Sequence, residues 1–209
     1  MRMLDLFAGL EGWSKPWRDR GHEVFSVDIE PSFDVDLHID IMDLLPEDLP
    51  WQPDVILASP PCETFSLMTV GKNWTHDHQP KTEKAALHAE LVKTTIALMR
   101  HLQPKAWVIE NPRAKLRKMP FMQGVPLHTV WYCQYGMPYA KPTDLFGVVP
   151  FWFPRPECHN GAGDHFRAPR GSRTGIQGGM PTALRALVPY QLSEEIMFAC
   201  ERSAWETSS

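Results

Sequence analysis

The sequence lacks several features that would assign its class at once. No apolar run reaches membrane-spanning length, and the N-terminus does not have the layout of a secretory signal. The four cysteines are scattered over 209 residues without a C-x-x-C pair, which argues against a disulfide framework and favours a reducing compartment. No internal repeat or linker interrupts the chain. We therefore expect a single domain that works in the cytoplasm without a membrane.

A strong positive charge is also missing, because the formal net charge is −4. The charges are unevenly distributed along the chain, however. Residues 1–54 contain 4 lysines and arginines against 13 acidic residues, whereas residues 55–209 contain 17 against 12. A polyanion would be expected to meet the second part of the chain. A solvated basic face explains the same asymmetry equally well.

Short apolar runs that alternate with amphipathic stretches predict an α/β fold with a mostly parallel sheet. The runs that indicate strands of this parallel part are residues 3–7, 23–27, 37–41, 55–58 and 106–110. Two further strands, residues 129–133 and 143–146, follow each other without a helix between them. This arrangement predicts an antiparallel hairpin at the end of the sheet. We expect one Rossmann-like domain covering residues 1–209.

Two helices of this domain have recognisable starts. The longer one is predicted at residues 81–103, where the Thr82 side chain can cap the first turn. Ser193 is the expected cap of a C-terminal helix. Between the hairpin and that helix, residues 148–180 are rich in arginine, glycine and proline and show little periodicity, which predicts an irregular segment.

A glycine turn follows the first strand and has the composition of a nucleotide-binding turn. Gly9 and Gly12 would let the backbone approach a ligand closely, and the next helix offers free N–H groups. Asp28 ends the second strand, where a carboxylate can accept hydrogen bonds from both ribose hydroxyls. Asp40 ends the third predicted strand and could accept from an adenine amino group. Because the spacing is G-x-x-G rather than G-x-G-x-x-G, a plain tight turn is an equal alternative.

A thiol and a carboxyl end two successive buried strands. Pro60 and Pro61 stop the strand of residues 55–58 abruptly, so Cys62 lies just past its carboxyl end. Glu110 ends the strand of residues 106–110, where a carboxylate is costly to bury without a role. Since ligands of open α/β sheets bind at the carboxyl edge, we expect both side chains there. A structural buried cysteine is the alternative for the thiol.

Polar and basic segments flank the same edge and predict contacts with nucleic acid. Residues 67–80 indicate a mobile loop that could close over the site. The candidate contacts are Ser66 and Lys72 at this loop, Arg113 and Lys115 in a basic run with Arg117 and Lys118, and Arg167, Arg170 and Arg173 in the irregular segment. A solvated loop is the alternative for the basic run.

The spacing of Cys158, His159 and His165 is loosely like that of zinc ligands. No fourth ligand is obvious in the sequence. We therefore predict that the chain binds no metal, with a zinc site as the less favoured alternative.

Together these segments resemble the DNA cytosine-5 methyltransferases, in the order of that family and over nearly the whole chain. Residues 5–13 are similar to its S-adenosylmethionine loop, and residues 59–66 to its Pro-Cys nucleophile motif. The other matching segments are residues 109–112 for the Glu-Asn motif, 135–143 for the Gln-x-Arg-x-Arg segment and 185–190 for the motif that closes the cofactor pocket.

The resemblance implies a mechanism and a set of site residues. Cys62 would add to C6 of a cytosine flipped out of double-stranded DNA, while Glu110 holds N3 and the exocyclic amino group. C5 would then take the methyl group of S-adenosylmethionine, and Lys141 and Thr143 are further catalytic candidates. The cofactor-binding residues that the resemblance implies are Phe7, Ala8, Gly9, Leu10, Gly12, Asp28, Ile29, Asp40, Ile41 and Pro60.

The chain also departs from the pattern of that family. Glu11 stands where glycine is usual, and Thr143 cannot replace the paired donors of a guanidinium. The irregular segment stands in place of a target-recognition domain, so we expect a short recognition sequence of about two to four bases. This compact form resembles phage or prophage members, which implies a bacterial or phage-infected cell.

Two other functions fit the same residues. A tRNA cytosine-5 methyltransferase would share all these motifs, and a non-catalytic DNA-binding protein could keep the fold. The presence of both Cys62 and Glu110 argues against the second. An NAD dehydrogenase is disfavoured because the glycine spacing is wrong and Cys62 would have no task.

Overall fold

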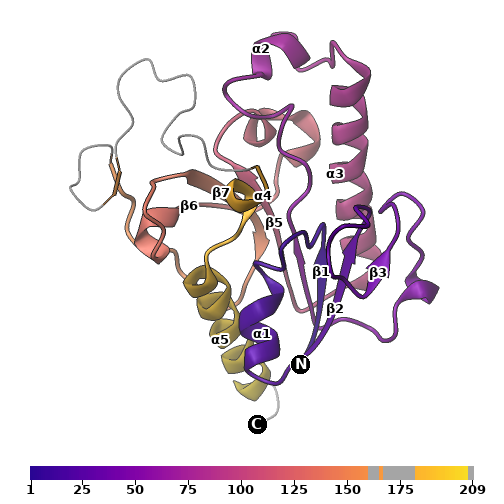
Figure 1. The fold of residues 1–209 in the computed structure, drawn as a ribbon, viewed down its shortest axis with the longest axis vertical. Helices are drawn as coiled ribbons and strands as arrows, with labels where there is room; N and C mark the ends of the chain where they lie inside the picture. The colour runs from indigo at the N-terminus through magenta and orange to yellow at the C-terminus, as the bar shows by residue number, and fades with distance from the viewer. Residues whose placement is uncertain (160–164, 167–181, 207–209) are drawn as a thin grey trace.

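A seven-stranded sheet organises the residues that the computed structural model describes, which are 1–159, 165–166 and 182–206 (Figure 1). Strands β1 to β5 pair in parallel, and β7 runs antiparallel to both β5 and β6. This confirms a mostly parallel sheet with a terminal antiparallel hairpin. The sheet order is β3-β2-β1-β4-β5-β7-β6, and the strands are β1 (Arg2–Leu6), β2 (Glu23–Asp28), β3 (Leu37–His38), β4 (Val55–Ala58), β5 (Ala106–Pro112), β6 (Leu127–Trp131) and β7 (Pro142–Val148).

Helices cover both faces of the sheet, which explains why the central strands are apolar on both sides. Because side chains alternate along a strand, Leu4 packs in the core on the side of α3 (Glu83–Leu102). Met3 packs on the other side, with α1 (Ser14–Asp19) and α5 (Tyr190–Glu206). Figure 1 shows α3 on one side of the sheet and α1 beside α5 on the other. The carboxyl ends of the parallel strands are thereby left free for a site.

The two predicted helix caps have different outcomes. Thr82 caps α3 as predicted, because its side chain accepts a hydrogen bond from the Ala85 N–H at 3.1 Å. The prediction for Ser193 is wrong, since α5 begins three residues earlier, at Tyr190. The Ser193 hydroxyl instead donates to the Trp13 carbonyl oxygen at 2.7 Å. It therefore joins α5 to the turn after β1.

Short helical turns fill several connections that the sequence indicated as loops. Strand β3 has only two residues and ends at His38, earlier than predicted. The shorter elements are η1 (Pro46–Asp48), α2 (Val70–Asn73), η2 (Leu116–Lys118), η3 (Pro120–Met122), η4 (Tyr132–Tyr135) and α4 (Thr182–Ala186). Among the described helices, none combines the length and apolarity that crossing a membrane would need.

Asp5 places a carboxyl in the fully buried centre of β1. One of its oxygens accepts from the Ser14 hydroxyl at 2.6 Å, and the other has no partner among the described residues. Burial raises the pKa of Asp5 to about 7. Because the folded-state pKa exceeds the unfolded one, the stability from this group is complete below about pH 4 and is lost as the pH rises through about 7.

We expect Asp5→Asn to remove this pH dependence, because the amide stays neutral in the same place. The variant should be more stable than the wild type at pH 8, by up to about 4 kcal/mol, and should match it near pH 4. Urea unfolding of both proteins at several pH values measures the difference, in which the contributions of other carboxyls cancel. A difference in unfolding free energy that is constant with pH would contradict the expectation.

Candidate active site

The turn after β1 is held in an unusual backbone conformation. Phe7, Gly9 and Glu11 all have positive φ angles, of 59°, 53° and 54°. Such angles suit glycine but strain other residues, so the surroundings must stabilise them. The Gly9 N–H donates to a carboxylate oxygen of Asp28 at 2.9 Å, which ties the turn to the end of β2. Glu11, which is not a glycine, also has the left-handed backbone conformation in this turn.

This turn forms one wall of a cavity of about 330 Å³. The predicted cofactor residues that line it are Phe7, Ala8, Gly9, Leu10, Gly12, Asp28 and Ile29. Residues 186–188 complete the lining, as the resemblance of residues 185–190 to a closing motif predicts. The lining residues that were not among the predicted cofactor residues are Trp13, Phe33, Ser59 and Pro61.

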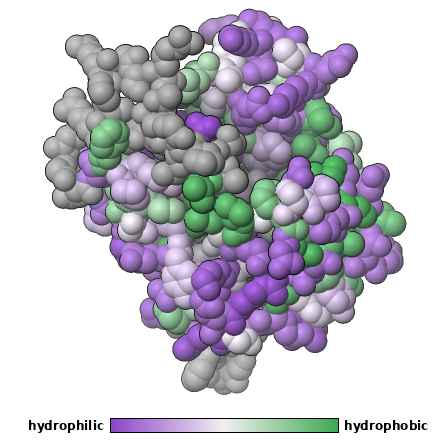
Figure 2. All heavy atoms as spheres, viewed as in Figure 1, coloured by the Kyte–Doolittle hydropathy of each residue, from purple (hydrophilic) through white to green (hydrophobic). Residues whose placement is uncertain are grey.

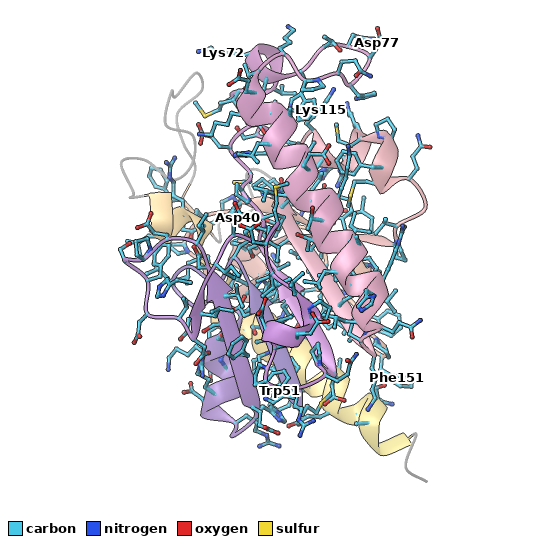
Figure 3. The ribbon with its side chains drawn as sticks, turned by 90° about the vertical axis from the view of Figure 1, so that its right-hand side faces the viewer. Asp40, Trp51, Lys72, Asp77, Lys115 and Phe151 are labelled. Atoms are coloured by element: carbon cyan, nitrogen blue, oxygen red, sulfur yellow. The ribbon has the colours of Figure 1, made fainter. Side chains whose placement is uncertain are left out.

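Three predicted cofactor residues lie outside the lining of this cavity. Asp40 follows the short β3 in a turn, where its carboxylate accepts from the Met42 N–H at 2.9 Å. Figure 3 shows Asp40 near the end of the sheet that faces Lys72 and Lys115. Ile41 is buried in the core. Pro60 is buried, and the neighbouring Pro61 lines the cavity instead.

Close packing around Gly12 shows why this position has no side chain. A Cβ atom there would lie 2.7 Å from the backbone nitrogen of Val188 and 3.0 Å from its oxygen. Any other residue would push the turn after β1 away from the segment before α5. The cavity therefore depends on direct backbone contact between two distant parts of the chain. An apolar patch borders α4 in the space-filling view (Figure 2), where Leu184 is half exposed.

The lining of the cavity fits the adenosine part of S-adenosylmethionine. Phe7, Phe33 and Ile29 offer flat or apolar surface for a purine ring. Both carboxylate oxygens of Asp28 accept from backbone N–H groups, those of Gly9 and Glu30, at 2.9 Å. Each oxygen keeps a further lone pair, so the carboxylate can also accept from ribose hydroxyls.

Cys62 and Glu110 are brought together by the pairing of β4 with β5. The two strands run in parallel with Ala58 opposite Ile109, so both side chains follow the same edge of the sheet. The Asn111 side chain donates to the Pro60 carbonyl oxygen at 3.2 Å, which fixes the turn before Cys62 to the end of β5. The predicted sharing of one edge by the thiol and the carboxyl is confirmed.

The charges of Glu110 and Lys141 both act on the Cys62 thiol. Burial raises the pKa of the Cys62 thiol, and the negative charge of Glu110 raises it further. The positive charge of Lys141 lowers it. The thiol is half-buried and lies in the field of the negative charge of Glu110 and the positive charge of Lys141.

Glu110 is only 4% exposed and is held by two donors. One of its oxygens accepts from the Tyr132 hydroxyl at 2.8 Å and from the Lys141 amino group at 3.4 Å. The amino group also lies 4.4 Å from the centre of the Tyr132 ring. No sequence motif marks Tyr132 as a site residue, because it lies near the end of a predicted strand.

Thr143 lies behind these groups rather than beside them. It is fully buried, and its hydroxyl donates to the backbone oxygen of Lys141 at 3.1 Å. Thr143 thus supports the backbone of Lys141, one of the two residues that hold Glu110.

The predicted nucleic-acid contacts differ in their exposure. Arg113 and Lys72 are exposed, and Ser66 is partly exposed with its hydroxyl 3.0 Å from that of Thr69. Figure 3 shows Lys72 on α2, beyond the carboxyl edge of the sheet and far from Trp51 at the other end. Arg167, Arg170 and Arg173 lie outside the described residues.

Two members of the basic run are engaged within the protein. Lys115 is 8% exposed, and its amino group donates to the Thr75 carbonyl oxygen at 3.4 Å. Arg117 forms an ion pair with the buried carboxylate of Asp144 and donates to the Thr129 hydroxyl at 2.8 Å. Lys115 therefore supports the loop of residues 67–80 in this structure and does not extend into solvent.

The loop of residues 67–80 is anchored beside Cys62. The Trp74 ring stacks on Phe65 with 5.3 Å between the ring centres, and its N–H donates to the Thr64 carbonyl oxygen at 2.9 Å. Trp74 also forms a backbone bridge with Pro80. The loop thus has a fixed base, with α2 at its outer end.

Comparison with known proteins gives matches to one family. The profile described as C-5 cytosine-specific DNA methylase matches residues 1–119, which include both Cys62 and Glu110. A Frog virus 3 (isolate Goorha) protein named as a DNA (cytosine-5)-methyltransferase is 30% identical over 161 residues. That alignment covers 72% of this chain and 73% of the viral protein.

Solved structures share the fold at lower sequence identity. A prophage-encoded protein of E. coli, described as a DNA modification methyltransferase, has a TM-score of 0.50 and 19% identity. The match covers 71% of this chain and 46% of that protein, so this chain spans less than half of that relative's length. The Dnmt2 methyltransferase of S. pombe follows at a TM-score of 0.46 and 14% identity, over 70% of this chain and 48% of that one.

Proposed function

The chain belongs to the C-5 cytosine-specific DNA methylase family, and from this premise we propose that it methylates C5 of cytosine in DNA. In this proposal S-adenosylmethionine is the methyl donor and Cys62 forms the covalent intermediate. The observation that carries the proposal is the placement of Cys62 just past the carboxyl end of β4 and of Glu110 near the carboxyl end of β5, two strands that pair in parallel. Both residues lie on the same sheet edge as the cavity lined by Phe7, Asp28 and Ile29.

The residues of the cavity would hold the cofactor by its adenosine part. Asp28 would accept from the ribose hydroxyls, and Phe7 and Ile29 would contact the purine. When bound, S-adenosylmethionine supplies an electrophilic methyl group on a positively charged sulfur. Pro61 and Ser59 line the cavity just before Cys62, so the chain itself connects the cofactor cavity to the nucleophile.

Cys62 and Glu110 would act on the cytosine ring. The carbon at position 5 is a poor nucleophile because the ring is aromatic, and addition of the Cys62 thiolate at C6 removes this obstacle. Glu110 would hold N3 and the exocyclic amino group and stabilise the charge that develops on the ring. C5 would then take the methyl group from the positively charged sulfur of S-adenosylmethionine, and loss of the C5 proton to solvent would let the Cys62 thiolate leave C6. Tyr132 and Lys141 keep the Glu110 carboxyl in position throughout.

DNA would meet the molecule at the same edge of the sheet. The target base must leave the duplex to reach a half-buried thiol, at a cost of a few kcal/mol. Contacts of Arg113 and Lys72 with phosphates would offset part of this cost. We propose a short recognition sequence, because only 33 residues separate the end of β7 from the start of α4. Methylation of a long unique site in sequenced DNA would refute this part of the proposal.

The proposal is tested by incubating the protein with labelled S-adenosylmethionine and either duplex DNA or tRNA. We expect the label in DNA, at C5 of cytosine, as bisulfite sequencing would show. Transfer to tRNA alone would identify an RNA enzyme of the same chemistry. Binding of DNA without any transfer would identify a non-catalytic protein.

We expect Asp28→Ala to weaken cofactor binding strongly, whereas Asp40→Ala should leave it nearly unchanged. The first change removes the carboxylate from the cavity wall, and the second removes one that the structure places outside the lining. Loss of hydrogen bonds to a charged group costs about 1.5–3 kcal/mol, which corresponds to roughly 10- to 150-fold in affinity. Titration calorimetry with S-adenosylmethionine measures both variants. Equal losses in the two variants would remove Asp28 from its proposed role.

A further inference from the structure

Three potential metal ligands, one from η4 and two from the stretch after β7, lie close together. Cys133 lies in η4, Cys158 follows β7 in an irregular stretch, and His165 lies seven residues further on. Their ligand atoms, two sulfurs and one imidazole nitrogen, all lie within 4.8 Å of one another. The sequence analysis considered Cys158 and His165 together with His159 and did not include Cys133, which is distant in the sequence.

The separations within this cluster match those of a zinc centre. Zinc binds sulfur at about 2.3 Å and imidazole nitrogen at about 2.0–2.1 Å in tetrahedral geometry. These lengths require about 3.6 Å between a sulfur and a nitrogen ligand and about 3.8 Å between two sulfurs. The Cys158 sulfur lies 3.6 Å from Nδ1 of His165, and the Cys133 sulfur lies within 4.8 Å of both atoms.

The geometry points to a structural zinc site formed by Cys133, Cys158 and His165. The described residues supply three ligands, and a water molecule would take the fourth position. Cys158 is buried, as is common for structural thiolate ligands, and all four cysteines of the chain are free. A histidine beside two thiols favours a metal over a disulfide, because a disulfide would leave the imidazole without a role.

The position of the site indicates what the metal would do. The residue after His165, Phe166, donates its N–H to the Pro138 carbonyl oxygen at 2.8 Å and forms a backbone bridge with Tyr139. Zinc would therefore fasten the segment after β7 to the chain between β6 and β7. Cys133 directly follows Tyr132, which holds Glu110. The metal would thus fix both the segment after β7 and the position of Tyr132, which holds Glu110 in the proposed active site.

The test is the metal content of the full chain, expressed with zinc in the medium and purified without chelators. We expect inductively coupled plasma mass spectrometry to find about one zinc ion per chain. Cys133→Ser, Cys158→Ser and His165→Ala should each lose the metal, and His165→Cys should restore it by supplying another thiolate. Cys62→Ser and His76→Ala are the matched controls, since His76 is fully exposed, and both should keep it.

A spectroscopic readout separates a true site from adventitious zinc. Cobalt exchanged into the wild-type protein should show the intense visible bands of tetrahedral coordination and a thiolate charge-transfer band, and both should be absent from Cys133→Ser. Zinc that is substoichiometric, or retained by all three ligand variants, would overturn the proposal. So would an intact mass lower by two hydrogens, because it would show a disulfide between Cys133 and Cys158. None of these measurements requires methyl transfer, so they stand apart from the test of the proposed function.

Discussion

Cys62→Ala is expected to abolish methyl transfer completely while leaving the affinity for S-adenosylmethionine nearly unchanged. The reason is chemical, because Cys62 is the proposed nucleophile that adds to C6 of cytosine, and without that addition C5 does not become nucleophilic. Cys62 is not part of the cavity lining, so the cofactor keeps all its contacts. Label transfer to DNA measures the first quantity, and calorimetry with the cofactor measures the second.

Cys200→Ala is the matched control for this substitution. Cys200 is buried in α5, within the core on the face of the sheet that α1 and α5 cover. Its loss should lower stability, as deletion of a buried sulfur does, and leave the reaction intact. Substantial activity in Cys62→Ala would remove the thiol from its proposed role, and equal inactivity of both variants would indicate a loss of folding instead.

Glu110→Gln is expected to lower the rate of methyl transfer by about 10²- to 10⁴-fold, the usual contribution of a positioned acid or base. The amide keeps the shape of the side chain and an oxygen for the Tyr132 hydroxyl, so folding should be preserved. Tyr132→Phe should give a smaller loss, because the carboxyl would remain but would be held by Lys141 alone. A rate within a few-fold of the wild type in Glu110→Gln would contradict the proposed role.

The same variant has a second readout that requires no DNA. Because the charge of Glu110 raises the pKa of the Cys62 thiol, Glu110→Gln should lower that pKa. Lys141→Met should raise it, since the positive charge of Lys141 acts in the opposite direction. The pH dependence of alkylation at Cys62, followed by mass spectrometry of the peptide, measures both shifts. Shifts in the same direction in the two variants would show that the charges do not act as described.

Local patterns were sufficient to predict much of the fold and the outline of the site. The strand ends before Cys62 and at Glu110 were recognisable because prolines or polar residues interrupt short apolar runs. Parallel pairing then brings any two neighbouring strand ends to one edge. The cap of α3 was predictable for the same reason, since Thr82 precedes a long periodic segment and acts only on its own helix.

Features that depend on contacts between distant segments could not be predicted in this way. Tyr132 lies in η4, which connects β6 to β7. It reaches Glu110 of β5 because β7 pairs with β5. Serine is a common helix cap, but the Ser193 hydroxyl donates its hydrogen bond to the carbonyl oxygen of Trp13, 180 residues away. Asp40 was predicted to contact the cofactor because it was expected at the end of the third strand. In the structure that strand ends at His38, two residues before Asp40. Each of these errors concerns tertiary structure that overrides a local preference.

The contact of Gly12 with Val188 has a consequence for the synthesis of the protein. A chain still growing on the ribosome completes the turn after β1, the ends of β4 and β5 and the β6–β7 hairpin before the backbone that presses on Gly12 has been made. The cavity beside Gly12 then lacks part of its wall until α5 has emerged and docked beside α1. The proposed capture of S-adenosylmethionine would therefore begin only after residue 188 has been made, and a chain truncated before it would carry the Cys62 thiol beside an incomplete cavity.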